Sequence, residues 1–337
     1  AGKVNGLIPK MLCKGKQIVE INRMKKALKI DISISFLVGA DFLNVMSNFN
    51  IDCKTVISLR NNPKEDLKNS SKLYRIIYRW IVRRSDSVVT LSVNVMDAAI
   101  KEFKLQKDTV CCIYNPIPTK IDFTEPPIIT ELRENKKKVI VTAGRLTNQK
   151  GQWNLIKAMS EVILHIPDTV LIILGEGSLF NELKTISEKL GLSDSVMFLG
   201  FVPNAIDYLK YADLFVFPSI YEGLGNVLIE AISVNQCIIS TDCPYGPREI
   251  LNSEIGIGNI SEMEIAKYGI LVPTGCHTIN DVIDKSDLVL GNAICKVLEN
   301  NTLRESIIQA TKERATEFDS SIIAAKWVDL FSRLISE

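Results

Sequence analysis

The sequence lacks three features that would each point to a particular class of protein. None of its apolar runs approaches the roughly 18 to 20 residues that a helix needs to cross a bilayer. It contains no Cys-x-x-Cys pair, and its only close cysteine and histidine neighbours are Cys276 and His277, so no zinc site is expected. The eight cysteines are scattered along a long chain, which indicates unpaired thiols in a reducing compartment. We therefore expect a cytoplasmic protein.

Positive and negative charges nearly balance over the whole chain but are unevenly distributed between its two parts. The net charge is +1, yet residues 1–120 contain 21 Lys and Arg against 10 Asp and Glu, a surplus of 11. Part of this surplus lies beside aromatic residues at helical spacing, in Tyr74, Arg75, Tyr78, Arg79, Trp80, Arg83 and Arg84. The pattern allows either a core helix with a solvated basic face or a surface attracted to an anionic membrane or a diphosphate-bearing acceptor. Nucleic acid is not an expected partner, because no recognised nucleic-acid-binding module accompanies the charge.

The chain of 337 residues is too long for one ordinary core, so two domains are expected. Short apolar segments alternate with amphipathic helices in both halves, which predicts an α/β protein with two parallel sheets. The strands expected in the first half are 32–36, 55–58, 87–91 and 110–114. Those in the second half are 139–142, 169–174, 196–199, 214–217, 237–240 and 269–272.

The expected domains are residues 1–125, joined by a C-terminal helix over 320–337, and residues 137–319. The stretch 119–136, with Pro126-Pro127 and mixed charges, suggests a linker between them. The first half offers few strands and no glycine-rich first turn, so we expect this domain to be truncated at its N-terminus.

Two carboxylates in the segment 218–231 are the most informative feature. An apolar strand ends at Phe217, the chain turns through Glu222-Gly-Leu-Gly225, and a helix that carries Glu230 follows. The first N–H groups of a helix lack intrahelical partners and attract phosphate. Helical spacing would place Glu230 only roughly 80° further round than Glu222. Because carboxylates accept hydrogen bonds from hydroxyls, a phosphate site flanked by two of them suits a nucleotide sugar.

Three loops that follow other predicted strands carry further candidates. In the loop 144–151, Arg145 and Lys150 are suited to hold a diphosphate from two sides, and a cationic pair can neutralise a departing nucleoside diphosphate without a metal. The turn Gly175-Glu-Gly177 is more typical of structure than of binding. The segment 200–203 is able to present the backbone of Gly200 and Val202 to a base. Arg248, after the strand 237–240, belongs to a rim loop or pairs with Glu249.

Six segments of the second half together resemble the donor-binding domain of the retaining glycosyltransferases of family 4. The resemblance covers roughly residues 139–272 and implies the GT-B fold, in which two Rossmann-like domains face each other across a cleft. The segments are Ala143-Gly-Arg-Leu with Gln149-Lys-Gly, Leu174-Gly-Glu-Gly, Leu199-Gly-Phe, Ala212-Asp-Leu-Phe-Val, Glu222-Gly with Asn226-Val-Leu-Ile-Glu-Ala, and Ser240-Thr-Asp-Cys-Pro with Gly246-Pro-Arg-Glu-Ile-Leu.

The resemblance also implies roles for individual residues. Arg145 and Lys150 would bind the donor diphosphate, Glu222 would contact the transferred sugar, and Glu230 would bind the ribose hydroxyls. The catalytic residues would be Arg145, Lys150 and Glu222. The phosphates would meet the backbone of the turn and the helix start, which comprise Gly223, Leu224, Gly225 and Asn226. Such enzymes need no bound metal, and their donor is a nucleoside diphosphate sugar, here most simply a UDP-sugar.

The first half matches that family's acceptor domain more loosely. It lacks the glycine-rich loop of many relatives, and the only histidines, His165 and His277, lie outside it, so Ser35, Phe36 or Arg60 are the candidates to line the site there. We expect a retaining enzyme that moves a hexose or N-acetylhexosamine to a glycan or lipid-linked glycan, peripheral to the inner membrane face. The alternatives are a non-catalytic nucleotide-sugar-binding partner with a degraded acceptor domain and, less favoured for want of histidines, a GT-B epimerase.

Overall fold

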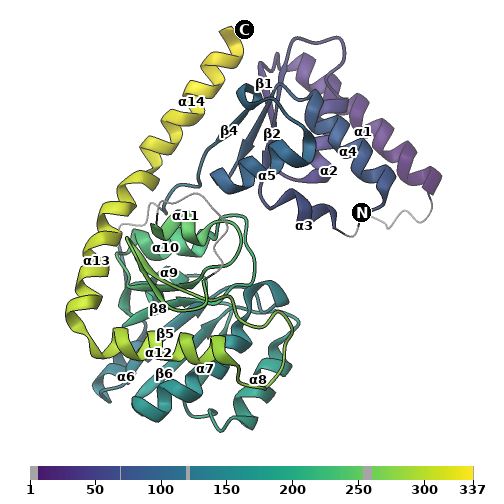
Figure 1. The fold of residues 1–337 in the computed structure, drawn as a ribbon. Helices are drawn as coiled ribbons and strands as arrows, with labels where there is room; N and C mark the ends of the chain where they lie inside the picture. The colour runs from purple at the N-terminus through teal and green to yellow at the C-terminus, as the bar shows by residue number, and fades with distance from the viewer. Residues whose placement is uncertain (1–6, 69, 119–121, 253–259, 337) are drawn as a thin grey trace. The chain divides into compact units, whose positions relative to one another are not determined.

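The computed structural model describes residues 7–68, 70–118, 122–252 and 260–336, which form two compact units (Figure 1). Unit 1 extends to Tyr114 and also includes the chain from Ile323 onward; unit 2 comprises Asn115–Ile322. Unit 2 therefore begins before the expected linker, because Ile117 N donates a hydrogen bond to Phe318 O over 2.9 Å. No helix within the described ranges combines the length and the apolar character that crossing a membrane would need.

Unit 1 is built on a four-stranded parallel sheet in the order β1-β2-β3-β4. The strands are β1 (Ile32–Ser35), β2 (Lys54–Leu59), β3 (Ser87–Thr90) and β4 (Val110–Cys112). The helices are α1 (Leu7–Ala27), α2 (Val38–Met46), α3 (Pro63–Leu67), α4 (Lys72–Arg84), α5 (Val93–Phe103) and the short 3-10 helix Lys107–Thr109.

Both faces of this sheet are covered. On one face, β2 and β3 pack against α4 and α5 in a core that includes Ile57, Val88 and Phe103. On the other face, Val56 and Val89 pack against the last helix, α14 (Ser320–Ser336). The two central strands, β2 and β3, are buried on both sides, which explains the short apolar runs by which the sequence predicted them; β1, Ile-Ser-Ile-Ser, lies at the edge and alternates.

Unit 2 contains a seven-stranded sheet in the order β10-β11-β9-β8-β5-β6-β7, in which only β10 is antiparallel. The strands are β5 (Lys138–Ala143), β6 (Thr169–Leu174), β7 (Val196–Gly200), β8 (Leu214–Phe217), β9 (Ile238–Thr241), β10 (Glu264–Ala266) and β11 (Gly269–Val272). The helices are α6 (Pro127–Glu134), α7 (Gln152–His165), α8 (Phe180–Lys189), α9 (Ala205–Tyr211), α10 (Asn226–Ser233), α11 (Pro247–Asn252), α12 (Lys285–Glu299) and α13 (Asn301–Ala315), with 3-10 helices Asn148–Lys150 and Thr316–Phe318.

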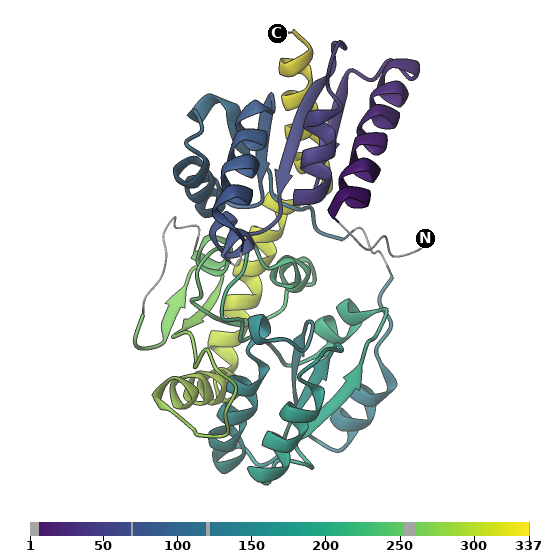
Figure 2. The same cartoon turned by 90° about the vertical axis from the view of Figure 1, so that its right-hand side faces the viewer.

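The prediction of two parallel α/β sheets is confirmed, but two details of it are wrong. Eight residues of the expected linker form helix α6, which packs on β5 and buries Ile129 completely; residues 119–121 lie outside the described residues. The antiparallel strand β10 was not expected, because three residues are too few to carry a recognisable alternation. Figure 2 shows the same two units after a quarter turn.

The order of the strands in unit 2 fixes where a ligand should bind. The chain builds β5, β6 and β7 to one side and then returns to place β8 on the other side of β5. In open parallel sheets, ligands bind beyond the carboxyl ends of the strands at this kind of switch point. The loops after β5 and β8 are therefore the first place to examine, and they carry the two segments that the sequence singled out.

Candidate functional site

The loops that follow β5 and β8 are bonded to each other. Ile220 N donates to Gln149 O over 2.8 Å, and Gln149 Nε2 donates to Tyr221 O over 3.1 Å. Gly151 adopts a φ of 60°, and a Cβ added there would lie 2.4 Å from Pro218 O. Only glycine fits so close a backbone contact at positive φ, so the close approach of the two loops requires glycine at position 151.

Lys150 and Glu222, one from each loop, form an ion pair. Lys150 Nζ lies 2.6 Å from Glu222 Oε1, and the two side chains are 16% and 7% exposed. The same ammonium lies 5.1 Å from the centre of the Phe217 ring, at the end of β8. Gln149 Nε2 donates to the second carboxylate oxygen over 3.3 Å. Both side chains are thus held in fixed positions at the edge of the sheet.

Helix α10 begins directly beyond this pair without a side-chain cap. Gly225 precedes its first residue with a φ of 90° and offers no side chain to the first N–H groups. Asn226, the first helical residue, accepts a hydrogen bond from Asn115 Nδ2 over 2.6 Å through its Oδ1 atom. An uncapped helix start that follows a glycine turn is suited to bind an anion such as phosphate.

The turn before α10 rests on the loop that follows β9. Gly246 has a φ of 104°, and a Cβ there would lie 2.2 Å from Leu224 O. Arg248 fixes this supporting loop, because its guanidinium bonds to Asp242 over 2.7 Å and to Glu264, at the start of β10, over 2.8 Å. Arg248 therefore has a positioning role, because it braces the loop that supports the turn.

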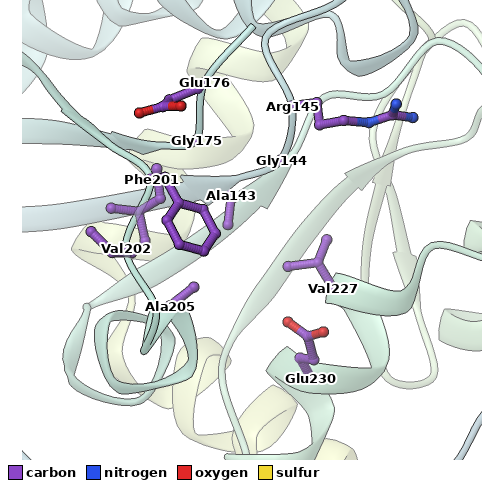
Figure 3. A pocket seen from close by; sticks show the side chains of 11 residues that line it. Ala143, Gly144, Arg145, Gly175, Glu176, Phe201, Val202, Ala205, Val227 and Glu230 are labelled. Atoms are coloured by element: carbon purple, nitrogen blue, oxygen red, sulfur yellow. The ribbon is translucent and has the colours of Figure 1, made fainter. Parts of the chain in front are cut away.

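A cavity of about 390 Å³ opens beside the start of α10 (Figure 3). It lies at the carboxyl ends of β5, β6 and β7. Figure 3 shows Val227 and Glu230 projecting from α10 across the cavity from Phe201 and Val202, while the Arg145 guanidinium extends away from both groups. The lining residues are Ala143, Gly144, Arg145, Leu174, Gly175, Glu176, Phe201, Val202, Ala205, Val227 and Glu230.

The charged groups of this cavity differ in their surroundings. Burial raises the pKa of the Glu230 carboxyl, and the charge of Lys150 partly opposes that shift. Arg145 is exposed, and its guanidinium has no partner among the described residues. One wall of the cavity thus carries a partly buried hydrogen-bond acceptor, and its rim carries a cation that is available for a ligand.

The structure brings together most of the residues that the sequence singled out, in two neighbouring groups. Arg145, Val202 and Glu230 line the cavity. The lining does not include Lys150, Glu222 or the turn from Gly223 to Asn226, which lie around the start of α10. Gly200 is structural in part, since its carbonyl accepts a hydrogen bond from Gly175 N over 2.7 Å. The Gly175-Glu-Gly177 turn packs on the loop 144–146, as a structural turn should.

One geometric expectation is wrong. Glu222 lies in the turn before α10, so the helical angle between it and Glu230 has no meaning. Three contributors were missed: the exposed ring of Phe201, the supporting Gly246 and the bond from Asn115. An aromatic residue in the loop after a parallel strand was a usable signal for Phe201. The other two depend on contacts between distant segments. Within the described residues, no group of three or more His, Cys, Asp or Glu side chains could hold a metal ion.

Comparison with known proteins gives the family. The family model described as glycosyl transferases group 1 matches residues 126–268. An uncharacterized glycosyltransferase of Methanocaldococcus jannaschii is 33% identical over 311 residues, which cover 88% of this chain and 76% of that protein. An N-acetylgalactosaminyltransferase of Campylobacter jejuni that acts on a diphospho-undecaprenol substrate is 25% identical over 310 residues, covering 91% of this chain and 77% of that enzyme.

Solved structures agree with the architecture. Anabaena HepE in complex with UDP superposes with a TM-score of 0.78 at 20% identity, over 94% of this chain and 82% of that one. Sucrose-phosphate synthase of Thermosynechococcus elongatus superposes with a TM-score of 0.75 at 17% identity, over 96% and 78% of the two chains. The motifs, the sheet order and these comparisons agree: the chain belongs to the group 1 glycosyltransferases, family 4, and has the GT-B fold.

Proposed function

We propose that this glycosyltransferase moves a hexose or N-acetylhexosamine from a UDP-sugar to a hydroxyl of a glycan or lipid-linked glycan. The transfer would retain the anomeric configuration and need no bound metal ion. The observation that carries the proposal is the arrangement at the switch point of unit 2. There, an uncapped helix start, two basic side chains and a cavity walled by Glu230 lie together.

In this proposal the nucleoside occupies the cavity. The Glu230 carboxylate accepts hydrogen bonds from the ribose hydroxyls, and the backbone of Gly200 and Val202 borders the base. The diphosphate lies against the start of α10, where the turn 223–226 offers backbone N–H groups. Arg145 reaches it from the rim with a guanidinium that has no partner among the described residues.

The sugar would lie beside the Lys150–Glu222 pair. Glu222 accepts hydrogen bonds from sugar hydroxyls, while Lys150 is shared between this carboxylate and the phosphate. The bond from the anomeric carbon to the diphosphate breaks as a bond to the acceptor oxygen forms on the same face. The acceptor proton passes to the leaving diphosphate, whose added negative charge is stabilised by Arg145, Lys150 and the helix start.

The relatives support the nature of donor and acceptor. HepE is known in complex with UDP, with UDP and glucose, and with UDP-glucose. The Campylobacter enzyme adds N-acetylgalactosamine to a diphospho-undecaprenol-linked sugar. Six cysteines of the described residues, Cys53, Cys111, Cys237, Cys243, Cys276 and Cys295, are free thiols, which suits the reducing compartment where we propose that the enzyme works.

Donor binding tests the first half of the proposal. Calorimetry with UDP and GDP in the presence of EDTA should give metal-independent binding that favours UDP, and Arg145→Ala should weaken it at least tenfold. Arg133→Ala, which removes an exposed arginine of α6, is the matched control and should bind normally. If UDP does not bind, or if binding needs a divalent cation, the proposed donor site is wrong.

Transfer tests the second half. Incubation of the enzyme with a panel of UDP-sugars and lipid-linked or free oligosaccharide acceptors should yield a product whose new linkage has the anomeric configuration of the donor. Binding of UDP without transfer to any acceptor would favour the non-catalytic partner that was the alternative interpretation. An inverted linkage would contradict the proposed front-face reaction.

A further inference from the structure

Helix α4 of unit 1 has two apolar faces, and only one of them is buried. Tyr78, Ile81 and Val82 are buried against the sheet, and the hydroxyl of Tyr78 anchors the helix by donating to Asp41 Oδ2 over 2.7 Å. A second set points outward with large exposed fractions. Its members are Leu73 at 67%, Ile76 at 64%, Ile77 at 42% and Trp80 at 49%.

The outward residues form one continuous stripe. Their positions repeat as i, i+3, i+4 and i+7, which places them along a single side of an α-helix. The buried residues 78, 81 and 82 define the opposite side. A core helix with a solvated basic face, one of the two interpretations of this segment, does not account for an outer side composed of three aliphatic residues and a tryptophan.

Basic residues border this stripe, and the helix contains no acidic residue. The Arg84 guanidinium lies 5.5 Å from the centre of the Trp80 ring. Neither Arg83 nor Arg84 has an acidic partner among the described residues. By contrast, Arg79 pairs with Glu102, and Arg75 bonds to Lys68 O, so Arg83 and Arg84 form a pair of cations without an acidic partner in the described parts of the chain, at the C-terminal end of the stripe.

This composition selects the partner. A second copy bound through a two-fold contact centred on α4 would bring the same basic helix against itself, and with no acid on α4 every register would oppose like charges. Branched aliphatic residues with a tryptophan, flanked by arginines, are instead typical of helices that lie in the interface of an anionic bilayer. Arginine side chains reach from such a helix to lipid phosphates while their apolar stems stay with the acyl chains.

We infer that α4 docks this protein onto an anionic lipid bilayer, with Leu73, Ile76, Ile77 and Trp80 entering the interface and Arg83 and Arg84 bound to lipid phosphates. The surplus of 11 basic residues in 1–120 supports this orientation, because it attracts the part of the chain that carries α4 to a negative surface. The inference does not depend on the identity of donor or acceptor, so it can fail or stand separately from the proposed function.

Vesicle flotation of the full chain tests the apolar stripe. The protein should float with vesicles of phosphatidylcholine and phosphatidylglycerol and much less with phosphatidylcholine alone. The double variant Ile76→Ser/Ile77→Ser should reduce binding at least tenfold. The control Leu164→Ser/Val328→Ser replaces two other exposed aliphatic residues and should bind normally. Equal losses in the two variants would overturn the assignment to α4.

A charge series tests the arginines. Arg83→Gln/Arg84→Gln should weaken binding to the mixed vesicles about 30-fold, since each basic residue near an anionic surface contributes about a factor of five. Lys184→Gln/Lys312→Gln makes the same change in net charge at exposed positions of unit 2 and should have little effect. If both pairs weaken binding equally, the attraction is due to overall charge and not to this helix.

Tryptophan quenching locates the contact directly. The chain has three tryptophans, of which Trp153 is fully buried. Vesicles that contain brominated lipids should quench part of the fluorescence, and Trp80→Phe should abolish that part. Absence of binding to any vesicle would overturn the inference. A concentration-dependent dimer that is lost in the Ile76→Ser/Ile77→Ser variant would then assign the stripe to a second copy.

Discussion

Two lysines seven residues apart, Lys150 and Lys157, make nearly the same bond in two very different places. Lys150 Nζ lies 2.6 Å from Glu222 at the carboxyl edge of the sheet, where both side chains keep some exposure. Lys157 Nζ lies 2.8 Å from Asp287 between α7 and α12, and both side chains are fully buried. The length of an ion pair therefore does not reveal its role, which depends on what else lies around it.

The groups around the Lys157–Asp287 pair hold helices α7 and α12 together. Lys157 also donates to Val282 O over 3.0 Å, and Asp287 belongs to the capping box that starts α12. The two helices approach closely there, since a Cβ on Gly291 would lie 2.7 Å from Glu161 Cβ. The Lys150 pair instead borders a turn, an uncapped helix start and a cavity. We expect the first pair to control stability and the second to control transfer.

The largest effect is expected from Lys157→Met. It leaves the Asp287 carboxylate buried without its partner, so unit 2 should lose about 3–5 kcal/mol of unfolding free energy. Urea denaturation followed by circular dichroism measures this loss. The double variant Lys157→Met/Asp287→Asn removes the orphaned charge and should recover part of it. If Lys157→Met lowers the free energy of unfolding by less than about 1 kcal/mol, the Lys157–Asp287 pair does not control stability and the proposed difference between the two pairs is wrong.

Lys150→Met is the same substitution at the other pair, and it should have the reverse profile. Transfer should fall by roughly 100- to 1000-fold, the usual cost of removing one group that stabilises charge in the transition state. The loss of unfolding free energy should be less than half of that caused by Lys157→Met, because Lys150 and Glu222 can still reach water. Normal turnover in this variant would contradict the role proposed for Lys150.

Glu230→Gln should weaken UDP binding by roughly 10- to 100-fold, the value of hydrogen bonds to a charged acceptor. The substitution should not destabilise the fold, because it removes a partly buried carboxyl without an ion-pair partner at hydrogen-bond distance. Asp287→Asn, at the structural pair, should lower stability and leave UDP affinity unchanged. Calorimetry and denaturation of the two variants, side by side, measure both properties.

The pH dependence of binding gives an independent test of the same carboxyl. Burial raises the pKa of Glu230, and its ionised form accepts hydrogen bonds from two hydroxyls more strongly than the protonated form does. UDP affinity should therefore fall as pH decreases through this raised pKa, beginning above the range of an ordinary carboxyl. The pKa of Glu230 is higher in the folded than in the unfolded protein, so the ionised carboxylate opposes folding. The free energy of unfolding should therefore rise as pH falls through this range, while UDP affinity falls. Glu230→Gln should make the affinity independent of pH in this window.

The smallest effect is expected from a residue that touches no ligand. Gly246→Ala would place a methyl group 2.2 Å from Leu224 O at a φ of 104°, so the turn before α10 must shift. UDP affinity should fall about tenfold, as expected when a supporting shell moves by a fraction of an ångström. Gly191→Ala is the matched control, since its φ of 69° is also positive but nothing lies within 4 Å. It should cost stability only.

Much of the site in unit 2 could be predicted because each signal is local. A strand, a glycine turn and a helix start lie within a few residues of Glu222, and β5 and β8 are continuous apolar runs. The sequence could not predict the bracing of the turn by Gly246 and Arg248. That depends on contacts across the sheet, and a glycine or arginine in a loop has no local signature of such a role.

For unit 1, the sequence predicted the strands of the sheet but not which side of helix α4 is exposed. Its strands β1–β4 lie close to where the sequence placed them, whereas the aromatic residues singled out in α4 differ in burial: Tyr78 is buried, and Tyr74 and Trp80 are exposed. The outward set of Leu73, Ile76, Ile77 and Trp80 was not distinguished, because a helix that is apolar on two sides has no single preferred face in its sequence. Only the packing of Tyr78, Ile81 and Val82 shows which side is inward.

The path of the chain through α14 has a consequence for biosynthesis. One face of the unit 1 sheet, at Val56, Val89 and Ile113, is covered by Ile323, Leu330 and Leu334 of that helix. The ribosome makes α14 only after all of unit 2, which is continuous in sequence and can fold as it emerges. The unit whose strands are synthesised first is therefore the last to complete its core, and until then it has an uncovered apolar face for chaperones to protect.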